Sequence, residues 1–193
     1  MRQLLVDLRG LGGSAKAPPS VLRNVLDTLE LGDEYALLDT LLGPLYVAWN
    51  KSGISAAMRA PDAEEFEAEF ERLYHRSVRP TRDVPCDLPR SFDLRGLTDF
   101  ERRVLLKTSE IPSGEVRTYS WVASEIGNPK AVRAVGSALA RNPIPVFIPC
   151  HRVVRSDGVI GNYGLGGPEA KRSILAAEGV ESDDIPRLVS TAR

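Results

Sequence analysis

The spacing of hydrophobic residues along this chain changes twice. Over residues 1–34 leucines and valines recur at helical intervals, which predicts two short helices separated by glycine- and proline-rich stretches. From residue 35 the pattern becomes typical of short strands, expected over 35–40, 45–50 and 54–58. A helix should then begin near Pro61, with aromatic residues on one face and glutamates mostly on the others. These patterns predict a small sheet with a helix packed on it.

The second half of the chain is predicted to form a separate helical domain. Three prolines among charged residues predict a linker over 79–95, between an N-terminal domain (35–78) and a second domain (96–180). Residues 1–34 would then be a helical extension, and 181–193 a frayed tail. The expected fold class is α+β.

Two short helices joined by a tight turn form a helix-turn-helix pattern in this second domain. Before them, Thr98 and Glu101 have the spacing of a capping box at the start of a helix. The first helix of the pair is expected over 120–126. The second is expected to begin at Asn128, with Pro129 in its first helical position, and to run to Arg141.

The second helix of that pair carries one long cation among small side chains. Arg133 lies close in sequence to Ala134, Gly136, Ser137 and Ala140. Such a surface lets a helix approach another backbone closely, either that of a packed helix or that of DNA. The stripe expected to face inward comprises Val132, Val135 and Leu139.

The stretch from Asn142 to Val154 holds the most reactive residue type in the chain. Residues 146–148 have the composition of a buried strand, and Pro149 restrains the backbone directly before Cys150. A free cysteine has a pKa of about 8.5, so Cys150 needs help to react as a thiolate. Neighbouring side chains diverge, so His151 is expected to act through a bridging water. Without further context, a buried structural cysteine beside a turn histidine would be the commoner explanation.

A glycine-rich loop and a last helix follow. Glycines over 161–167 let the backbone lie tight against a flat ligand. The helix is expected to run from Pro168 to Glu178. A carboxylate at a helix C-terminus opposes the macrodipole, at a cost of about 0.3–1 kcal/mol if it is unpaired.

Composition narrows the class of protein without deciding it. The 193 residues are 42% hydrophobic and 26% charged, which is typical of a soluble globular protein. Two cysteines, Cys86 and Cys150, form no disulfide framework and suit a reducing cytoplasm. No hydrophobic run reaches the roughly 20 residues of a membrane helix. His75 and Cys86 lack companions at metal-ligand spacing, and the net charge of −1 gives no support for DNA binding.

The region around Cys150 resembles the active-site signature of the O6-alkylguanine-DNA alkyltransferases, also called methylated-DNA–protein-cysteine methyltransferases. The signature is Pro149-Cys150-His151-Arg152-Val153-Val154. The resemblance runs from about residue 100 to 179 and is more specific than the Cys-His pair alone. Further motifs that carry it lie at 127–136, 161–163 and 174–179, and residues 35–93 resemble the family's N-terminal domain more faintly. It implies a ribonuclease-H-like N-terminal domain and a winged-helix-like catalytic domain.

The resemblance implies a DNA repair protein that acts once. It would bind double-stranded DNA in the minor groove, flip out the damaged nucleotide and transfer the alkyl group of O6-alkylguanine, and of O4-alkylthymine, to Cys150. No cofactor, metal or membrane is expected, and the protein should be a cytoplasmic monomer. A non-catalytic lesion binder would lack Cys150, and a cysteine hydrolase would need a histidine other than the adjacent His151.

The same resemblance assigns roles to individual residues. Cys150 would be the nucleophile, His151 the base acting through water, and Glu178 the carboxylate that orients His151. Tyr119 would assist departure of the guanine, and Asn142 would tie the recognition helix to the active-site strand. The expected DNA contacts are Arg133, which would fill the space left by the base, and Thr118, Ala131, Val132, Ala134, Gly136 and Ser137. The expected pocket lining is Tyr163, Val153, Gly164, Pro145 and Leu139, and Leu165 is one extra residue in the pocket loop.

Overall fold

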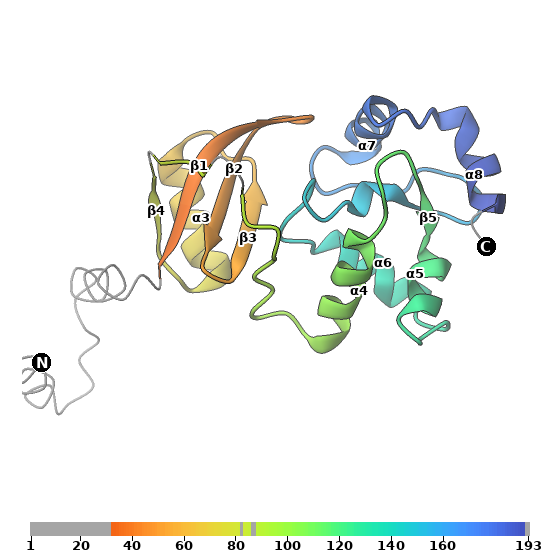
Figure 1. The fold of residues 1–193 in the computed structure, drawn as a ribbon, viewed down its shortest axis with the longest axis horizontal. Coiled ribbons are helices and arrows are strands. Elements are labelled where there is room, and N and C mark those ends of the chain that lie inside the picture. Colours follow the sequence, from red (N-terminus) through yellow and green to blue (C-terminus); the bar gives the residue numbers. More distant parts are fainter. Residues whose placement is uncertain (1–31, 82, 86–87, 192–193) are drawn as a thin grey trace, which may run out of the picture. The chain divides into compact units, whose positions relative to one another are not determined.

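A computed structural model describes residues 32–81, 83–85 and 88–191 (Figure 1). The chain from Asp33 onward forms one compact unit. The two helices predicted within residues 1–34, and Cys86, lie outside the described residues.

The N-terminal part of this unit is a four-stranded sheet in the order β3-β2-β1-β4. Strands β1 (Asp33–Thr40), β2 (Gly43–Asn50) and β3 (Gly53–Met58) pair as an antiparallel meander, and β4 (Val78–Pro80) runs parallel to β1. The three strands predicted from the sequence are confirmed to within two residues. Strand β4 was missed because three residues, one of them proline, are too few to show a period.

One face of the sheet is covered by helix α3 (Ala63–Tyr74). Asp62 caps this helix, because its side chain accepts a hydrogen bond from the Glu65 amide at 2.9 Å. Phe66 and Phe70 of the helix are fully buried. Their cluster on the sheet contains Tyr35, Ala48 and Ala56.

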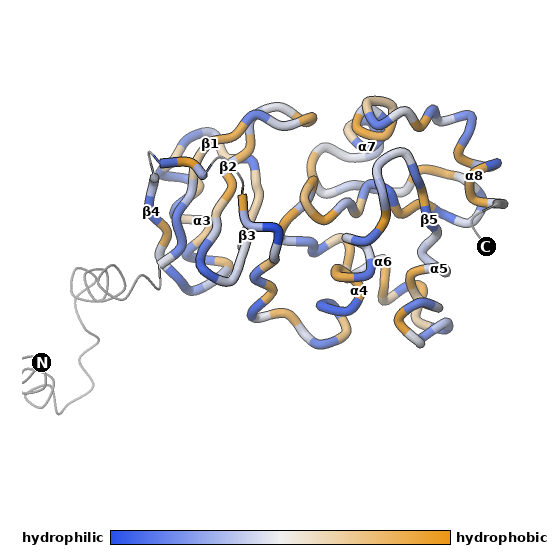
Figure 2. The backbone as a smooth tube through the Cα atoms, viewed as in Figure 1, coloured by the Kyte–Doolittle hydropathy of each residue, from blue (hydrophilic) through white to orange (hydrophobic). Residues whose placement is uncertain are grey.

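The other face of the sheet belongs to the main hydrophobic core. Successive side chains on a strand point to opposite faces. Accordingly Val47 and Ala57, which neighbour the residues under α3, join one cluster with Val104, Leu139 and Cys150. Figure 2 shows hydrophobic stretches both on the sheet and in the C-terminal part of the chain, in keeping with this shared core. The sheet is therefore buried on both faces.

Helix α4 (Asp99–Ser109) opens the C-terminal part. The predicted capping box is confirmed: the Thr98 hydroxyl accepts from the Glu101 amide, and the Glu101 carboxylate accepts from the Thr98 amide. The short strand β5 (Arg117–Thr118) and helix α5 (Tyr119–Glu125) follow.

Helix α6 (Val132–Ala140) begins three residues later than predicted, with Ala131 and not Asn128 as the residue before its first turn. Asn128 is not its cap. Residues 128–131 instead form a turn in which the Ala131 amide donates to the Asn128 carbonyl at 2.8 Å. Val132 also departs from the prediction, since it is 36% exposed; Val135, Ala138 and Leu139 form the buried stripe.

The strand predicted over 146–148 is wrong. The chain there makes a tight turn in which the Ile148 amide donates to the Ile144 carbonyl at 2.9 Å, and Val146 has a left-handed φ of 76°. Prolines at 143, 145 and 149 remove the amide donors that a strand would need. The turn leads into a single 3₁₀ turn, η1 (Cys150–Arg152), and strand β6 (Val153–Val154), which pairs in parallel with β5.

The C-terminal segment is ordered rather than frayed. After α7 (Gly167–Ala177) come a 3₁₀ turn, η2 (Ser182–Asp184), and helix α8 (Ile185–Thr191). Ile185 and Val189 are buried. Their cluster also contains Val116, Val154, Leu175 and Val180. The prediction of a frayed tail missed this helix, although the two apolar residues, four positions apart, have helical spacing in the sequence.

The α+β fold class is confirmed, whereas the ribonuclease-H-like and winged-helix-like descriptions remain predictions. No helix in the described ranges is long and apolar enough to cross a membrane.

Candidate active site

Cys150 lies at the start of η1 and is 8% exposed. Asn142, just after α6, holds both the thiol and the turn before it. Its side-chain Nδ2 donates to Cys150 Sγ at 3.2 Å and to the Ile148 carbonyl at 2.9 Å, while its Oδ1 accepts from the Ile144 amide at 3.0 Å. A donor aimed at sulfur stabilises the thiolate more than the thiol.

The environment of Cys150 contains opposing influences on its pKa. Burial raises the pKa of the thiol, while the Asn142 hydrogen bond and the positive charge of Lys171 lower it; burial prevails. The resting form at neutral pH is therefore the thiol, and reaction requires a group that takes its proton.

His151 is fully buried and contacts Glu178, with 3.2 Å between Nε2 and Oε1. Burial lowers the pKa of His151 to about 4, although the Glu178 carboxylate acts in the opposite direction. The imidazole is therefore neutral at pH 7, with the Nε2 proton directed at the carboxylate. Its Nδ1 is left as a proton acceptor with no hydrogen-bond partner in the described part of the chain. The Tyr163 ring packs edge-on against the imidazole, with centroids 6.1 Å apart.

Arg152 completes this arrangement. Its guanidinium donates to both Glu178 oxygens, at 2.9 and 2.6 Å, and to the Ile111 carbonyl at 2.5 Å. Burial raises the pKa of Glu178, but the hydrogen bonds from Arg152, together with His151, bring it below its usual value. The carboxylate at the end of α7 is therefore paired, and the cost expected from the helix dipole is offset. No role had been predicted for Arg152, although it lies beside His151 in the signature.

Lys171 was also missed. It is 1% exposed, and its ammonium donates to the Val153 carbonyl at 2.6 Å and lies 6.0 Å from the centroid of the Tyr119 ring. Burial lowers the pKa of Lys171 to about 8, against the influence of Cys150. A signal was present in the sequence, because Lys171 precedes Ile174 and Leu175 at the spacing of the helix's buried face.

A cavity of about 220 Å³ opens onto the thiol. Its lining residues are Tyr119, Gly136, Leu139, Ala140, Cys150, Asn162, Tyr163 and Gly164. All except Ala140 and Asn162 were predicted to be site residues, Gly136 as a DNA contact and not as pocket lining. Val153 and Pro145, expected in the lining, are buried but do not line this cavity.

Tyr119 reaches the cavity beneath α6. A β-carbon on Gly161 would stand 3.0 Å from the Tyr119 hydroxyl, and one on Gly136 would stand 3.9 Å from the Tyr119 ring. Burial, and secondarily Cys150, raises the pKa of Tyr119, so its hydroxyl keeps its proton at neutral pH. The two glycines therefore leave room for a phenol that can donate a hydrogen bond into the cavity.

Comparisons with known proteins agree with this site. A family model described as "6-O-methylguanine DNA methyltransferase, DNA binding domain" matches residues 99–180. Over 153 residues the chain is 34% identical to the methylated-DNA–protein-cysteine methyltransferase of Methanosarcina acetivorans, covering 75% of this chain and 97% of that relative. The chain belongs to the methylated-DNA–protein-cysteine methyltransferase family.

Two further relatives match different shares of this chain. The methylated-DNA–protein-cysteine methyltransferase of Rattus norvegicus is 52% identical over 82 residues, which are 42% of this chain and 39% of that relative. The chain thus spans less than half the length of the rat protein. The crystal structure of Mycobacterium tuberculosis OGT in complex with DNA has a TM-score of 0.59 and 30% identity, covering 80% of this chain and 99% of that one.

In this methyltransferase family member, α6 exposes the residues predicted to meet DNA. Arg133, Ala134 and Ser137 are exposed, and Gly136 and Ala131 are partly so. The Arg133 guanidinium makes no hydrogen bond or ion pair with any residue that the structure describes. This exposed cation lies on the helix whose Gly136 lines the cysteine cavity.

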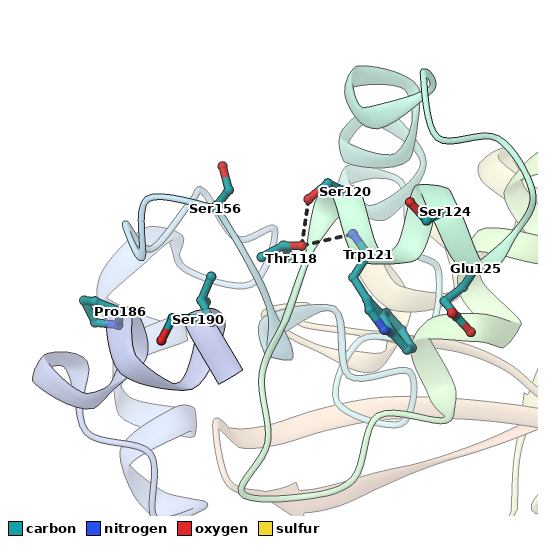
Figure 3. Close-up of a pocket in the computed structure, with 9 residues that line it drawn as sticks. Thr118, Ser120, Trp121, Ser124, Glu125, Ser156, Pro186 and Ser190 are labelled. Carbon is teal, nitrogen blue, oxygen red and sulfur yellow. Dashed lines mark hydrogen bonds between the residues drawn. The ribbon is translucent and has the colours of Figure 1, made fainter. Parts of the chain in front are cut away.

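A larger groove, of about 580 Å³, lies between α5 and α8 (Figure 3). Thr118, at its edge, caps α5: its hydroxyl accepts from the Trp121 amide at 3.0 Å and lies 2.8 Å from the Ser120 hydroxyl. The rest of the lining comprises Ser124, Glu125, Ser156, Pro186, Val189 and Ser190. The Glu125 carboxylate is paired with Lys107 at 2.8 Å, and none of the proposed catalytic residues lines the groove. Of the two hollows, the smaller is the one lined by the predicted nucleophile, Cys150.

Among the residues described, no group of three or more His, Cys, Asp and Glu side chains is placed to hold a metal ion.

Proposed function

We propose that this protein repairs DNA by transferring the alkyl group of O6-alkylguanine to Cys150. The observation that carries the proposal is the cavity itself, with a buried thiol at its base, held by Asn142 and adjacent in sequence to a neutral histidine paired with Glu178. The family membership supports the same reaction. O4-alkylthymine presents the same kind of alkyl–oxygen bond and is proposed as a second substrate.

The reaction begins with loss of the thiol proton. The unpartnered Nδ1 of His151 receives it through one water molecule, and Glu178 stabilises the imidazolium that forms. The Sγ electron pair then attacks the alkyl carbon in line with the bond to O6, and that bond breaks with its electrons passing to the guanine. Tyr119 donates a hydrogen bond or a proton to the leaving base. The product thioether is stable, so each molecule acts once.

Access to the lesion requires the nucleotide to leave the duplex. We propose that α6 enters the minor groove, where its small exposed side chains permit close approach and Arg133 occupies the space left by the flipped base. Thr118, Ala131, Val132, Ala134, Gly136 and Ser137 are proposed to complete the contact. The protein is proposed to act as a cytoplasmic monomer without a cofactor.

Intact mass spectrometry tests the proposal. After incubation with excess duplex containing O6-methylguanine, the mass should rise by one methyl group, located on Cys150, and repair should stop at one equivalent. Cys150→Ser should gain no mass. Repeated turnover, or methylation found at Cys86, would contradict the proposal.

A further inference from the structure

One wall of the proposed substrate cavity is a short loop from Tyr163 to Gly167. The Gly167 amide donates to the Tyr163 carbonyl at 2.9 Å, which closes the loop on itself. Gly166 has a φ of 116°, a conformation that favours glycine. Leu165, the extra residue relative to the family pattern, is partly buried and packs against the main core. The loop is thus tied to the protein body at its centre and not only at its ends.

The end of β3 and the residue after it approach two segments next to the cavity, one at Pro143 and one at Gly166. The Ala57 amide donates to the Pro143 carbonyl at 2.9 Å, beside the Asn142 that contacts the thiol. Two residues further along the chain, the Arg59 guanidinium donates to the Leu42 carbonyl in the β1–β2 turn. Its Nη1 lies 3.7 Å from the point where a β-carbon on Gly166 would stand. Arg59 therefore lies between the β1–β2 turn and the pocket loop.

We propose that Arg59 is a positioning residue that holds the Tyr163–Gly167 loop against the cavity and so restricts the protein to small alkyl groups. This inference rests on the proposed alkyl transfer and adds its size selectivity. Cavities that bind drug-sized ligands measure about 300–1,000 Å³, whereas this one measures about 220 Å³. A base with a small alkyl group can be accommodated, but a benzyl-sized group requires the loop to move outward, away from Arg59.

The position of Arg59 favours the loop over DNA as its partner. One guanidinium nitrogen is already engaged by the Leu42 carbonyl, which fixes the direction of the side chain. The charge is also close enough to act on Tyr163, the residue that begins the loop and lines the cavity. Arg59 is exposed, but its hydrogen bond to the Leu42 carbonyl directs the guanidinium toward the loop, where its bulk and charge oppose outward movement.

The test compares Arg59→Met and Arg59→Lys with the intact protein. Arg72→Met is the matched control, because Arg72 is an exposed arginine on α3 that pairs with Glu69 of the same helix. Single-turnover alkylation of Cys150 is measured with free O6-methylguanine and free O6-benzylguanine, which need no DNA contact. Affinity for O6-methylguanine duplex and hydrogen exchange at the Gly167 amide are measured in parallel.

We expect Arg59→Met to raise the benzyl-to-methyl rate ratio by about tenfold, the factor associated with losing the charged hydrogen bond to the Leu42 carbonyl that holds the guanidinium beside the loop. The ratio for Arg59→Lys should lie between those of Arg59→Met and the intact protein, and Arg72→Met should leave the ratio unchanged. Exchange at Gly167 should accelerate only in the Arg59 variants, with duplex affinity retained. A tenfold change in the ratio with faster exchange would support the positioning role.

An unchanged ratio would overturn the inference, as would a loss of duplex affinity with equal rates on both free bases, which would make Arg59 a DNA contact. Failure of the intact protein to alkylate Cys150 with any substrate would instead refute the proposed function. The exchange measurement would still decide whether Arg59 holds the loop, so the two failures are distinguishable.

Discussion

Arg152 and Glu178 form a two-hydrogen-bond ion pair beneath the active site, with the Arg152 side chain 15% and the Glu178 side chain 7% exposed. This pair keeps Glu178 ionised where it meets His151. It links η1, which carries the nucleophile, to the end of α7. The orientation of the histidine thus depends on an arginine that does not itself face the cavity.

Replacing Arg152 with Met should strongly destabilise the protein and slow alkyl transfer. Removing one partner of a buried ion pair leaves the other charge uncompensated, at a cost of about 3–5 kcal/mol. Urea unfolding measures the loss. Arg155→Met, which removes an exposed pair with Asp157, should cost less than about 1 kcal/mol. Equal losses of stability in the two variants would show that the Arg152–Glu178 pair stabilises the protein no more than an exposed ion pair does.

The His151–Glu178 pair should behave as one unit in catalysis. Glu178→Gln and His151→Ala should each slow single-turnover alkylation, and the double variant should be little slower than the slower single variant. Duplex affinity should persist in all three variants, because neither residue is proposed to hold DNA. Additive rate losses would mean that Glu178 serves only the helix end.

The buried neutral His151 should also make stability depend on pH. Its pKa in the folded protein is about 4, below the ordinary value of 6.5. The unfolded chain therefore binds more protons between these values, and stability falls as the pH drops from 6.5 to 4. The shift corresponds to about 3 kcal/mol. Comparing urea unfolding of the intact protein and His151→Asn at several pH values isolates this contribution, since His151→Asn should lose less stability over the same interval.

Lys171→Met should make Cys150 less reactive. The positive charge of Lys171 lowers the pKa of the thiol, and methionine fills a similar volume without the charge. The pH dependence of thiol modification by iodoacetamide should therefore move upward. Lys107→Met, which removes the partly exposed ion pairs of Lys107 with Glu110 and Glu125, is the control. An unchanged profile in Lys171→Met would assign Lys171 to packing alone.

Arg133→Ala should impair repair of duplex DNA far more than reaction with a free O6-alkylguanine base. Its proposed task is to hold open the space left by the flipped nucleotide, which costs a few kcal/mol that a free base does not incur. Arg172→Ala, on the exposed face of α7, is a matched control. Equal losses on both substrates would argue against this role.

The sequence alone was sufficient to predict features that depend on residues a few positions apart in the chain. Thr98 and Glu101 form their capping box within one helical turn, and the strands of the sheet follow from the alternation of their own side chains. The resemblance around Cys150 identified most of the cavity residues, because its motifs lie in the same order along the chain. These features can be predicted without knowing which distant segments pack against them.

The tertiary structure decided what depends on segments distant in sequence. Residues 146–148 have strand-like composition but form a turn. The prolines there lack amide donors, and the Asn142 side chain hydrogen-bonds the Ile148 carbonyl and the Ile144 amide. Lys171 meets Tyr119, and Arg152 meets Glu178, only after α7 folds back onto η1. Residues Ile185 and Val189 become core only because Val116 and Val154 offer an apolar surface. Hydrophobic burial and ion pairing act between groups that adjoin in space, and spacing along the chain does not reveal those neighbours.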